Sequence, residues 1–146
     1  MIRKMKISDL NRIVEIEKNA FKSPWNEDQF RYELLENPYS ELWVLEEDGI
    51  IKGYYDLWII FENAEIATIG VDPLYQKQGY GQKLMDHLTN EAMKHECETI
   101  ALEVRVSNIP AISLYENNGF FTINVKQGYY KDPDGHEDAY RMMKGI

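Results

Sequence analysis

The spacing of apolar residues predicts two helices after a short first strand. Residues 2–7 form the expected strand. Apolar residues then follow one helical face from Leu10 to Phe21, and Ser8 and Asp9 offer an N-cap for this helix. A second helical pattern spans 26–36, because an asparagine can cap its start and a proline follows its end. A short loop with a tryptophan joins the two helices.

The middle of the chain carries the pattern of an antiparallel sheet. Three stretches rich in β-branched and aromatic residues cover 41–47, 50–61 and 64–72. Two-residue turns at 48–49 and 62–63 separate them, and turns of this length join adjacent antiparallel strands. These stretches therefore predict a meander of three strands.

The second half of the chain alternates between helical and strand patterns. Apolar residues at helical spacing predict a helix over 79–95, and an alternating strand follows over 99–106. Asn108 can cap a short helix, which a left-handed stop ends at 117–119. Two strands separated by a loop finish the chain, at 120–126 and 137–144. Because no linker or repeat interrupts these elements, we expect one α/β domain, of the α+β type, over residues 1–146.

Composition and charge exclude several classes of protein. At 146 residues, with 44% apolar and 28% charged residues, the chain is typical of a single globular domain. The net charge of -9 disfavours direct binding of DNA or RNA, which requires dense lysine and arginine. The single cysteine, Cys97, cannot form an internal disulfide, and the scattered histidines predict no metal site. No stretch is apolar enough to span a membrane, so we expect a soluble protein of the reducing cytoplasm.

A glycine-containing turn lies between the predicted strand at 64–72 and the predicted helix at 79–95. Residues 76–81 read Q-K-Q-G-Y-G, and glycines in such a turn let the backbone approach a ligand closely. The free N–H groups at the start of a helix attract phosphate, and Lys77 adds a positive charge. Alone, the pattern arises by chance in roughly one chain of this length in fifteen. It therefore indicates a phosphate-bearing ligand only in combination with other features.

A carboxylate and a phenol follow the glycine turn along the chain. Alternation places Glu103 and Arg105 on the face of the strand opposite its apolar side chains. Tyr115 lies on the next helix, so the carboxylate and the phenol can converge. Each residue alone also fits a simpler interpretation, with Glu103 and Arg105 as an ordinary surface pair and Tyr115 as a half-buried aromatic residue.

Together these motifs resemble the GNAT acetyltransferases, and within them the RimI type, which acetylates the N-terminus of a small-subunit ribosomal protein. The resemblance covers nearly the whole chain. It rests on Ser23-Pro24-Trp25, Gly70 to Pro73, Gln76 to Gly81, Leu102 to Arg105, Asn108, Ala111, Leu114-Tyr115, Gly119-Phe120, Tyr129-Tyr130 and Glu137 to Ala139. The sequence departs from the common pattern at Gln76, where arginine is frequent, and at Gly70, where a small apolar residue is common. Because backbone N–H groups supply most of the pyrophosphate recognition, we expect a modest effect from Gln76.

The resemblance implies a mixed, mostly antiparallel sheet that is flanked by helices and splayed where acetyl-CoA, the co-substrate, binds. It implies direct attack of an amine on the thioester, with Glu103 as the proton acceptor and Tyr115 as the proton donor. The residues assigned to acetyl-CoA are Ile69, Gly70 and Val71 for the acetyl-pantetheine arm, Gln76, Lys77, Gln78, Gly79, Tyr80, Gly81 and Gln82 around the pyrophosphate, and Asn108 for the pantetheine. No metal is expected.

The expected acceptor is a polypeptide with a free N-terminus. The resemblance implies the N-terminal alanine of ribosomal protein 18 of the small subunit, a basic protein. The peptide backbone would be held by Trp25, Tyr129 and Tyr130. For Trp25, packing of the loop against the sheet is an equally good interpretation.

Two alternative functions stay open. The enzyme could acetylate a small cationic amine, a polyamine or an aminoglycoside, which the acidic composition also suits. The chain could instead be an acyl-CoA-binding module without turnover, which the pairing of Glu103 with Tyr115 disfavours.

Overall fold

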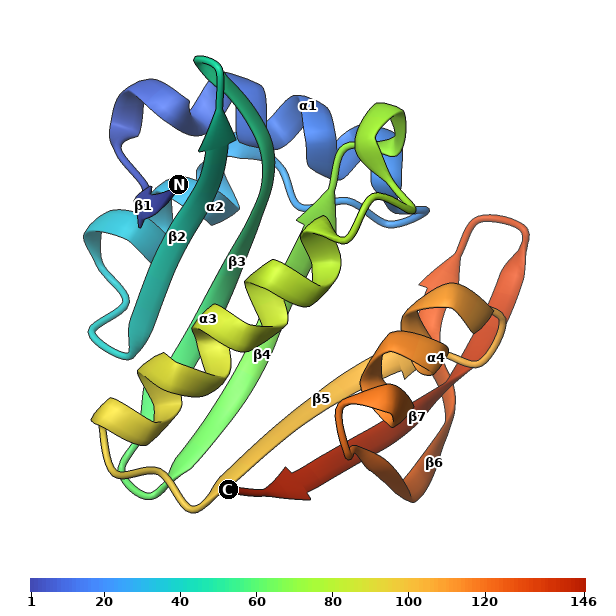
Figure 1. The fold of residues 1–146 in the computed structure, drawn as a ribbon. Coiled ribbons are helices and arrows are strands. Elements are labelled where there is room, and N and C mark those ends of the chain that lie inside the picture. Colours follow the sequence, from blue (N-terminus) through green and yellow to red (C-terminus); the bar gives the residue numbers. More distant parts are fainter.

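Seven strands form one sheet whose two halves spread apart like the arms of a V (Figure 1). The computed structural model describes residues 1–146. The strands are β1 (Ile2–Lys4), β2 (Ser40–Glu47), β3 (Ile50–Ile60), β4 (Asn63–Val71), β5 (Thr99–Arg105), β6 (Phe121–Asp132) and β7 (Gly135–Gly145). The helices are α1 (Leu10–Ala20), α2 (Glu27–Leu35), α3 (Tyr80–Lys94) and α4 (Ile109–Asn117), with short 3-10 turns η1 (Ile7–Asp9) and η2 (Pro73–Tyr75). The strand order is β1-β2-β3-β4-β5-β7-β6, which confirms the predicted mixed, mostly antiparallel sheet.

The V opens between β4 and β5, the only parallel neighbours in the sheet. These strands share three residue pairs, starting with Asn63 and Thr99, and then diverge (Figure 1). Both strands stay paired on their outer sides, because β3 follows β4 as far as Val71 and β7 follows β5 as far as Arg105. The divergence therefore leaves one edge of each strand facing the gap, as the family resemblance implied.

The helices cover both faces of the sheet and bury two clusters of apolar side chains. α1 and α2 pack on one face of β1 to β4, whereas α3 and α4 lie on the opposite face (Figure 1). The larger cluster surrounds α3 and the smaller one lies under α1 and α2. Four apolar side chains of α3 are fully buried against the sheet: Leu84, Met85, Leu88 and Ala92.

The first strand is shorter than the sequence pattern suggested. β1 ends at Lys4, and η1 forms where the strand was expected to end. Asp9 does not cap α1 with its side chain. Its carboxylate instead accepts hydrogen bonds from the backbone N–H of Lys6 and from the guanidinium of Arg3. The Asp9 carboxylate is therefore occupied by a partly buried ion pair with Arg3 and does not serve as the helix cap.

The last two strands form a longer hairpin than the sequence predicted. β6 reaches Asp132 and β7 starts at Gly135, so Tyr129 and Tyr130 lie on a strand and the expected loop is wrong. A bulge interrupts the pairing between Lys126 and Tyr130. The half of β6 that the sequence did not predict, residues 127–132, reads Q-G-Y-Y-K-D and lacks the alternation of apolar and polar residues that marks a strand.

The packing of Tyr54 explains why position 70 on β4 is a glycine. A Cβ atom at this position would lie 2.6 Å from the Tyr54 hydroxyl oxygen. Gly70→Ala is therefore expected to lower the free energy of unfolding by about 1–3 kcal/mol, the usual cost of overpacking a buried site. Urea denaturation measures this loss, and adding Tyr54→Phe should restore part of it. An unchanged unfolding free energy for Gly70→Ala would show that Tyr54 has room to move.

Candidate active site

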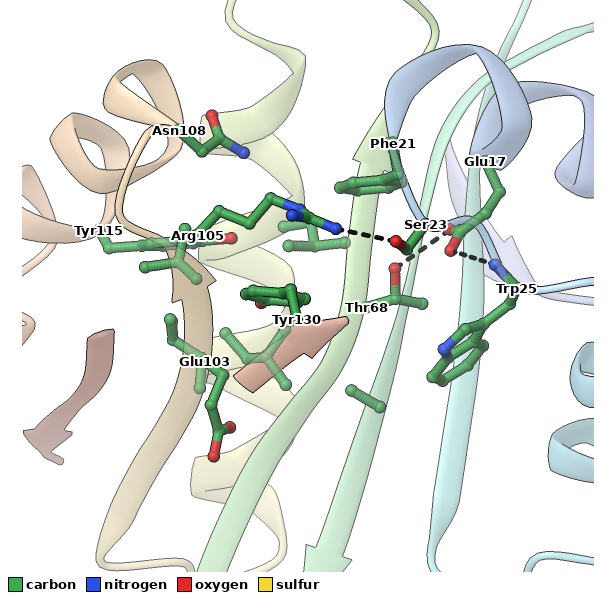
Figure 2. A pocket seen from close by; sticks show the side chains of 15 residues that line it. Glu17, Phe21, Ser23, Trp25, Thr68, Glu103, Arg105, Asn108, Tyr115 and Tyr130 are labelled. Carbon is green, nitrogen blue, oxygen red and sulfur yellow. Dashed lines mark hydrogen bonds between the residues drawn. The ribbon is translucent and has the colours of Figure 1, made fainter. Parts of the chain in front are cut away.

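Two adjoining cavities lie where β4 and β5 diverge. The turn cavity is lined by the glycine turn before α3 and by α4. The sheet cavity is lined by β4, β5 and the segment between α1 and α2 (Figure 2). The residues that line both cavities are Phe21, Ile69, Asn108 and Tyr115. A ligand in the turn cavity can therefore present one end to the sheet cavity.

The glycine turn supplies free backbone donors to the turn cavity. Lys77 and Gly79 have positive φ angles of 63° and 88°, and Gly79 is the N-cap of α3. No side chain caps the first turn of this helix, so its N–H groups are available to a ligand. With the positive end of the helix dipole they form a site that suits a phosphate group. The side chain of Lys77 lines the same cavity and adds a positive charge.

Most of the residues that the resemblance assigns to acetyl-CoA come together in the turn cavity. They are Ile69, Gly70, Val71, Gln76, Lys77, Tyr80, Gly81 and Asn108. Gln78, Gly79 and Gln82 do not line it, and the Gln82 side chain donates to Asp86 and Asn118 at 2.8 Å each. Sequence reasoning missed the apolar wall formed by Phe21, Tyr75, Pro110 and Leu114. Apolar spacing does not distinguish a cavity wall from a core.

Tyr115 on α4 lies where the two cavities meet. Its ring packs against Phe120 with 5.8 Å between the ring centroids, and the residue is buried. Burial raises the pKa of the Tyr115 phenol above its ordinary value. The phenol is therefore protonated at neutral pH and available as a hydrogen-bond donor. Asn108 lies beside it as the N-cap of α4, with its side-chain oxygen 3.3 Å from the backbone nitrogen of Ala111.

Glu103 lines the sheet cavity, and its carboxylate is paired with two cations. Arg141 on β7 donates to both carboxylate oxygens at 3.0 Å, and Lys126 on β6 donates to Oε1 at 2.7 Å. Figure 2 shows the carboxylate pointing away from Tyr115. Glu103 and Tyr115 therefore line the same cavity, as predicted, but their polar groups do not point toward each other.

Of the three aromatic residues expected at the acceptor side, two line the sheet cavity. Trp25 lies in the wall and also packs on Phe30, with 5.2 Å between ring centroids, so it combines both interpretations. The ring of Tyr130 lies 4.1 Å from the guanidinium of Arg105, and burial raises the pKa of Tyr130 to about 12. Tyr129 does not line the cavity; it is exposed and packs edge-on against Tyr130.

Glu17 is a buried carboxylate in the sheet cavity that sequence reasoning missed. It accepts hydrogen bonds from the Thr68 hydroxyl at 3.2 Å and from the Trp25 backbone N–H at 3.1 Å (Figure 2). The Tyr54 hydroxyl donates a third. Burial raises the pKa of Glu17, and these hydrogen bonds oppose the rise. In the sequence, Glu17 stands among the apolar residues of α1, and this pattern indicated a helix face but not a residue of a cavity.

Arg105 joins the two sides of the sheet cavity. Its guanidinium donates to both oxygens of Asp132 at 2.8 and 2.9 Å, to Glu137 at 2.9 Å and to the Ser23 hydroxyl at 2.8 Å. Ser23 in turn donates to Asp132 at 2.8 Å. Hydrogen bonds from Arg105 and Ser23 hold the pKa of Asp132 well below its usual range. The segment between α1 and α2 is thereby tied to the β6–β7 hairpin.

Arg105→Lys is expected to loosen this connection. A lysine ammonium cannot reproduce the planar fork that bonds Asp132, Glu137 and Ser23 together. If the segment between α1 and α2 moves, the acceptor loses one wall of its cavity, so KM for the acceptor should rise about tenfold, equivalent to about 1.4 kcal/mol. KM for acetyl-CoA should change little. Steady-state kinetics with each substrate varied in turn measures both values, and equal increases in the two would contradict the expectation.

Two further features concern metals and membranes. Glu41, Glu91 and His95 hold possible metal-ligand atoms within 4.8 Å of one another, and none of these residues lines either cavity. Nε2 of His95 lies 3.3 Å from Oε1 of Glu41, so these two residues already contact each other. No helix is both long and apolar enough to cross a membrane.

The splayed, mostly antiparallel sheet agrees with a comparison of the sequence with models of protein families. Residues 10–120 match the model of the acetyltransferase (GNAT) family. The chain belongs to the GNAT family. It is therefore an acetyl-CoA-dependent N-acetyltransferase.

GNAT relatives with assigned substrates match nearly the full chain. The [ribosomal protein bS18]-alanine N-acetyltransferase of Escherichia coli is 36% identical over 145 residues, covering 99% of this chain and 97% of the relative. A Bacillus subtilis protein, provisionally assigned the same activity, is 38% identical over 145 residues, covering 99% and 95%. The crystal structure of the Escherichia coli ribosomal-protein-S18-alanine N-acetyltransferase superposes with a TM-score of 0.92 at 34% identity, covering 100% and 93%.

Proposed function

We propose that this GNAT enzyme transfers the acetyl group of acetyl-CoA to the N-terminal alanine of ribosomal protein bS18. The main support is the similarity to an enzyme of that named activity, at 36% identity over 99% of this chain and 97% of that enzyme. The meeting of the turn cavity and the sheet cavity at Tyr115 fits a transfer between two substrates. Because the acceptor is a ribosomal protein, the reaction would take place in the cytoplasm.

Acetyl-CoA would occupy the turn cavity. Its pyrophosphate fits the free N–H groups at the start of α3, beside Lys77. The pantetheine arm would pass Asn108 and the exposed edge of β4 from Ile69 to Val71. The thioester would then lie beside Tyr115, at the entrance to the sheet cavity.

Transfer would proceed by direct attack of the amine on the thioester carbonyl carbon. The new C–N bond forms, the C–S bond breaks, and the coenzyme leaves as a thiol that takes its proton from Tyr115. The α-ammonium loses two protons in all: Glu103 accepts the first before the attack, and the second, released when the amide forms, restores the phenol of Tyr115. A backbone N–H near Val71 would polarise the carbonyl oxygen. Glu103 would accept the amine proton, through water because its carboxylate points away from Tyr115 (Figure 2).

Tyr115 would donate to the departing sulfur. Its raised pKa makes full proton transfer to a free thiolate unfavourable, since an ordinary thiol titrates near 8.5. Donation would therefore accompany the breaking of the C–S bond, while negative charge builds on the sulfur. A protonated, buried phenol suits this role because it needs no prior change of charge.

An α-amino group is a better acceptor for this site than a lysine. Deprotonation at pH 7 costs about 1 kcal/mol for an α-amino group and about 4.6 kcal/mol for a lysine side chain. The single carboxylate Glu103 is an adequate base for the first but a poor one for the second. This argument favours a polypeptide N-terminus over internal lysines.

Peptide acetylation tests the proposal. Acetyl-CoA turnover should be seen with a peptide that begins with the N-terminal sequence of bS18. The same peptide with a blocked N-terminus and an internal lysine serves as the matched control and should remain unmodified. Turnover with the control alone, or with polyamines and aminoglycosides but no peptide, would overturn the proposed substrate.

A further inference from the structure

Two carboxylates line the sheet cavity, and they differ in how their charge is balanced. Glu103 is paired with Arg141 and Lys126. Glu17 has only neutral donors around it, and no lysine, arginine or histidine forms an ion pair with it. Buried charges in proteins are usually paired with an opposite charge. Glu17 is therefore the carboxylate of this cavity that lacks a counter-charge.

The cation in the same cavity does not supply that counter-charge. Arg105 is already balanced by two carboxylates, Asp132 and Glu137. On the side of the cavity where Glu17 lies, the Arg105 guanidinium donates a hydrogen bond to the Ser23 hydroxyl and not to Glu17 (Figure 2). A second cation entering the cavity would thus meet an uncompensated carboxylate on one wall and a neutralised guanidinium on the other.

Glu17 also has room for one more hydrogen bond. A carboxylate can accept about four, two on each oxygen. Oε1 accepts from Tyr54 and Thr68, whereas Oε2 accepts only from the backbone N–H of Trp25. Because Glu17 is 3% exposed yet lines the cavity, any further donor must come from within the cavity.

We propose that Glu17 binds the protonated α-amino group of the acceptor as it enters the sheet cavity. The inference rests on the proposed function and adds a residue to it. The ammonium supplies the missing positive charge and donates to the free position on Oε2. The neutral donors from α1's neighbouring strands fix the carboxylate in place, so the ammonium meets a preorganised partner.

Capture by Glu17 and deprotonation by Glu103 are separate events. Glu17 acts on the charged acceptor that arrives, so its loss should raise KM for the peptide. Glu103 acts on the proton that leaves before attack, so its loss should lower kcat. The two carboxylates on different walls of the cavity therefore have effects that kinetics can separate.

A pair of peptides tests the contact between Glu17 and the ammonium directly. One peptide begins with alanine, and the other begins with a propionyl group, which has the same shape but lacks the amine. Binding is measured by calorimetry with free CoA present, so that no turnover occurs. The wild-type protein should bind the alanine peptide about tenfold more tightly, and Glu17→Gln should remove this preference.

The comparison of two peptides separates a direct contact from a merely structural role. If Glu17→Gln weakens both peptides equally, Glu17 only maintains the cavity wall and the inference is wrong. If the variant keeps the full preference for the alanine peptide, the ammonium binds elsewhere and the inference is also wrong. Tyr54→Phe removes one hydrogen bond to Glu17 without removing its charge, and it should keep the preference.

Two more controls keep the test decisive. Should Glu17→Gln fail to fold, Glu17→Asp places the charge one methylene further from the cavity, and it should reduce the preference; an undiminished preference would contradict the inference. Peptide acetylation by the wild-type protein without any amine preference in binding would refute the role of Glu17 and leave the proposed function intact. Absence of any peptide acetylation would instead count against the proposed function.

Discussion

Tyr115→Phe is expected to lower kcat by about a hundredfold, the lower range for loss of a positioned acid. The substitution removes only the hydroxyl that lies where the two cavities meet. The phenylalanine ring can keep the packing against Phe120, so the fold should be preserved. Affinity for CoA should be nearly unchanged, because we propose that the turn before α3 makes most of the contacts with the cofactor. Steady-state kinetics and calorimetry with CoA measure the two effects.

The matched control for this prediction is Tyr39→Phe. Tyr39 is exposed and lies in neither cavity, so the loss of its hydroxyl should not alter kcat. A Tyr115→Phe variant that folds normally and turns over at the wild-type rate would exclude Tyr115 as the proton donor. A variant that loses CoA binding as well would show that the hydroxyl helps to hold the cofactor.

Asp56→Asn is expected to stabilise the protein at neutral and alkaline pH. Asp56 is fully buried, and burial together with the adjacent Glu33 carboxylate raises the pKa of Asp56 to about 10. The ionised form would leave both oxygens without a hydrogen-bond donor, so the folded protein keeps the proton. Unfolded aspartate titrates near 3.9, so keeping the proton at pH 7 costs up to roughly 4 kcal/mol. Asparagine is neutral and can donate to Glu33, so we expect a gain of about 2–4 kcal/mol.

The pH dependence has a definite sign. The folded state holds the Asp56 proton up to about pH 10, whereas the unfolded chain releases it above about pH 4. The stability that this group contributes is therefore complete below pH 4 and is lost as pH rises through this window, by up to about 1.4 kcal/mol per unit. Urea denaturation from pH 6 to 9 should show the wild type falling relative to Asp56→Asn, with Asp48→Asn in an exposed turn as the control. Parallel pH profiles would contradict the raised pKa.

The helix ends that depend on neighbouring residues were predictable from the sequence. Asn26 caps α2 through the backbone N–H of Gln29, and Gly79 takes the positive φ that opens α3. Gly119 takes a positive φ after α4, as its position after two asparagines suggested. Each of these signals lies within a few residues of the structure that it specifies, so a single sequence contains it.

The features that shape the sheet cavity depend on residues far apart in the chain. Glu17 meets Tyr54 and Thr68, which follow it by 37 and 51 residues. Arg105 meets Ser23 across 82 residues. Periodicity along one helix or strand contains no information about such partners, because they are brought together only when the sheet forms. For the same reason Arg105 looked like half of an ordinary surface pair.

The acceptor that we propose for this enzyme is the N-terminal alanine of bS18. Intact-mass spectrometry of ribosomal proteins from cells with and without this enzyme tests it most directly. We expect bS18 from cells lacking the enzyme to be lighter by one acetyl group and to have a free N-terminal alanine. Supplying the enzyme again should restore the acetyl group. A fully acetylated bS18 in cells lacking the enzyme would contradict the claim.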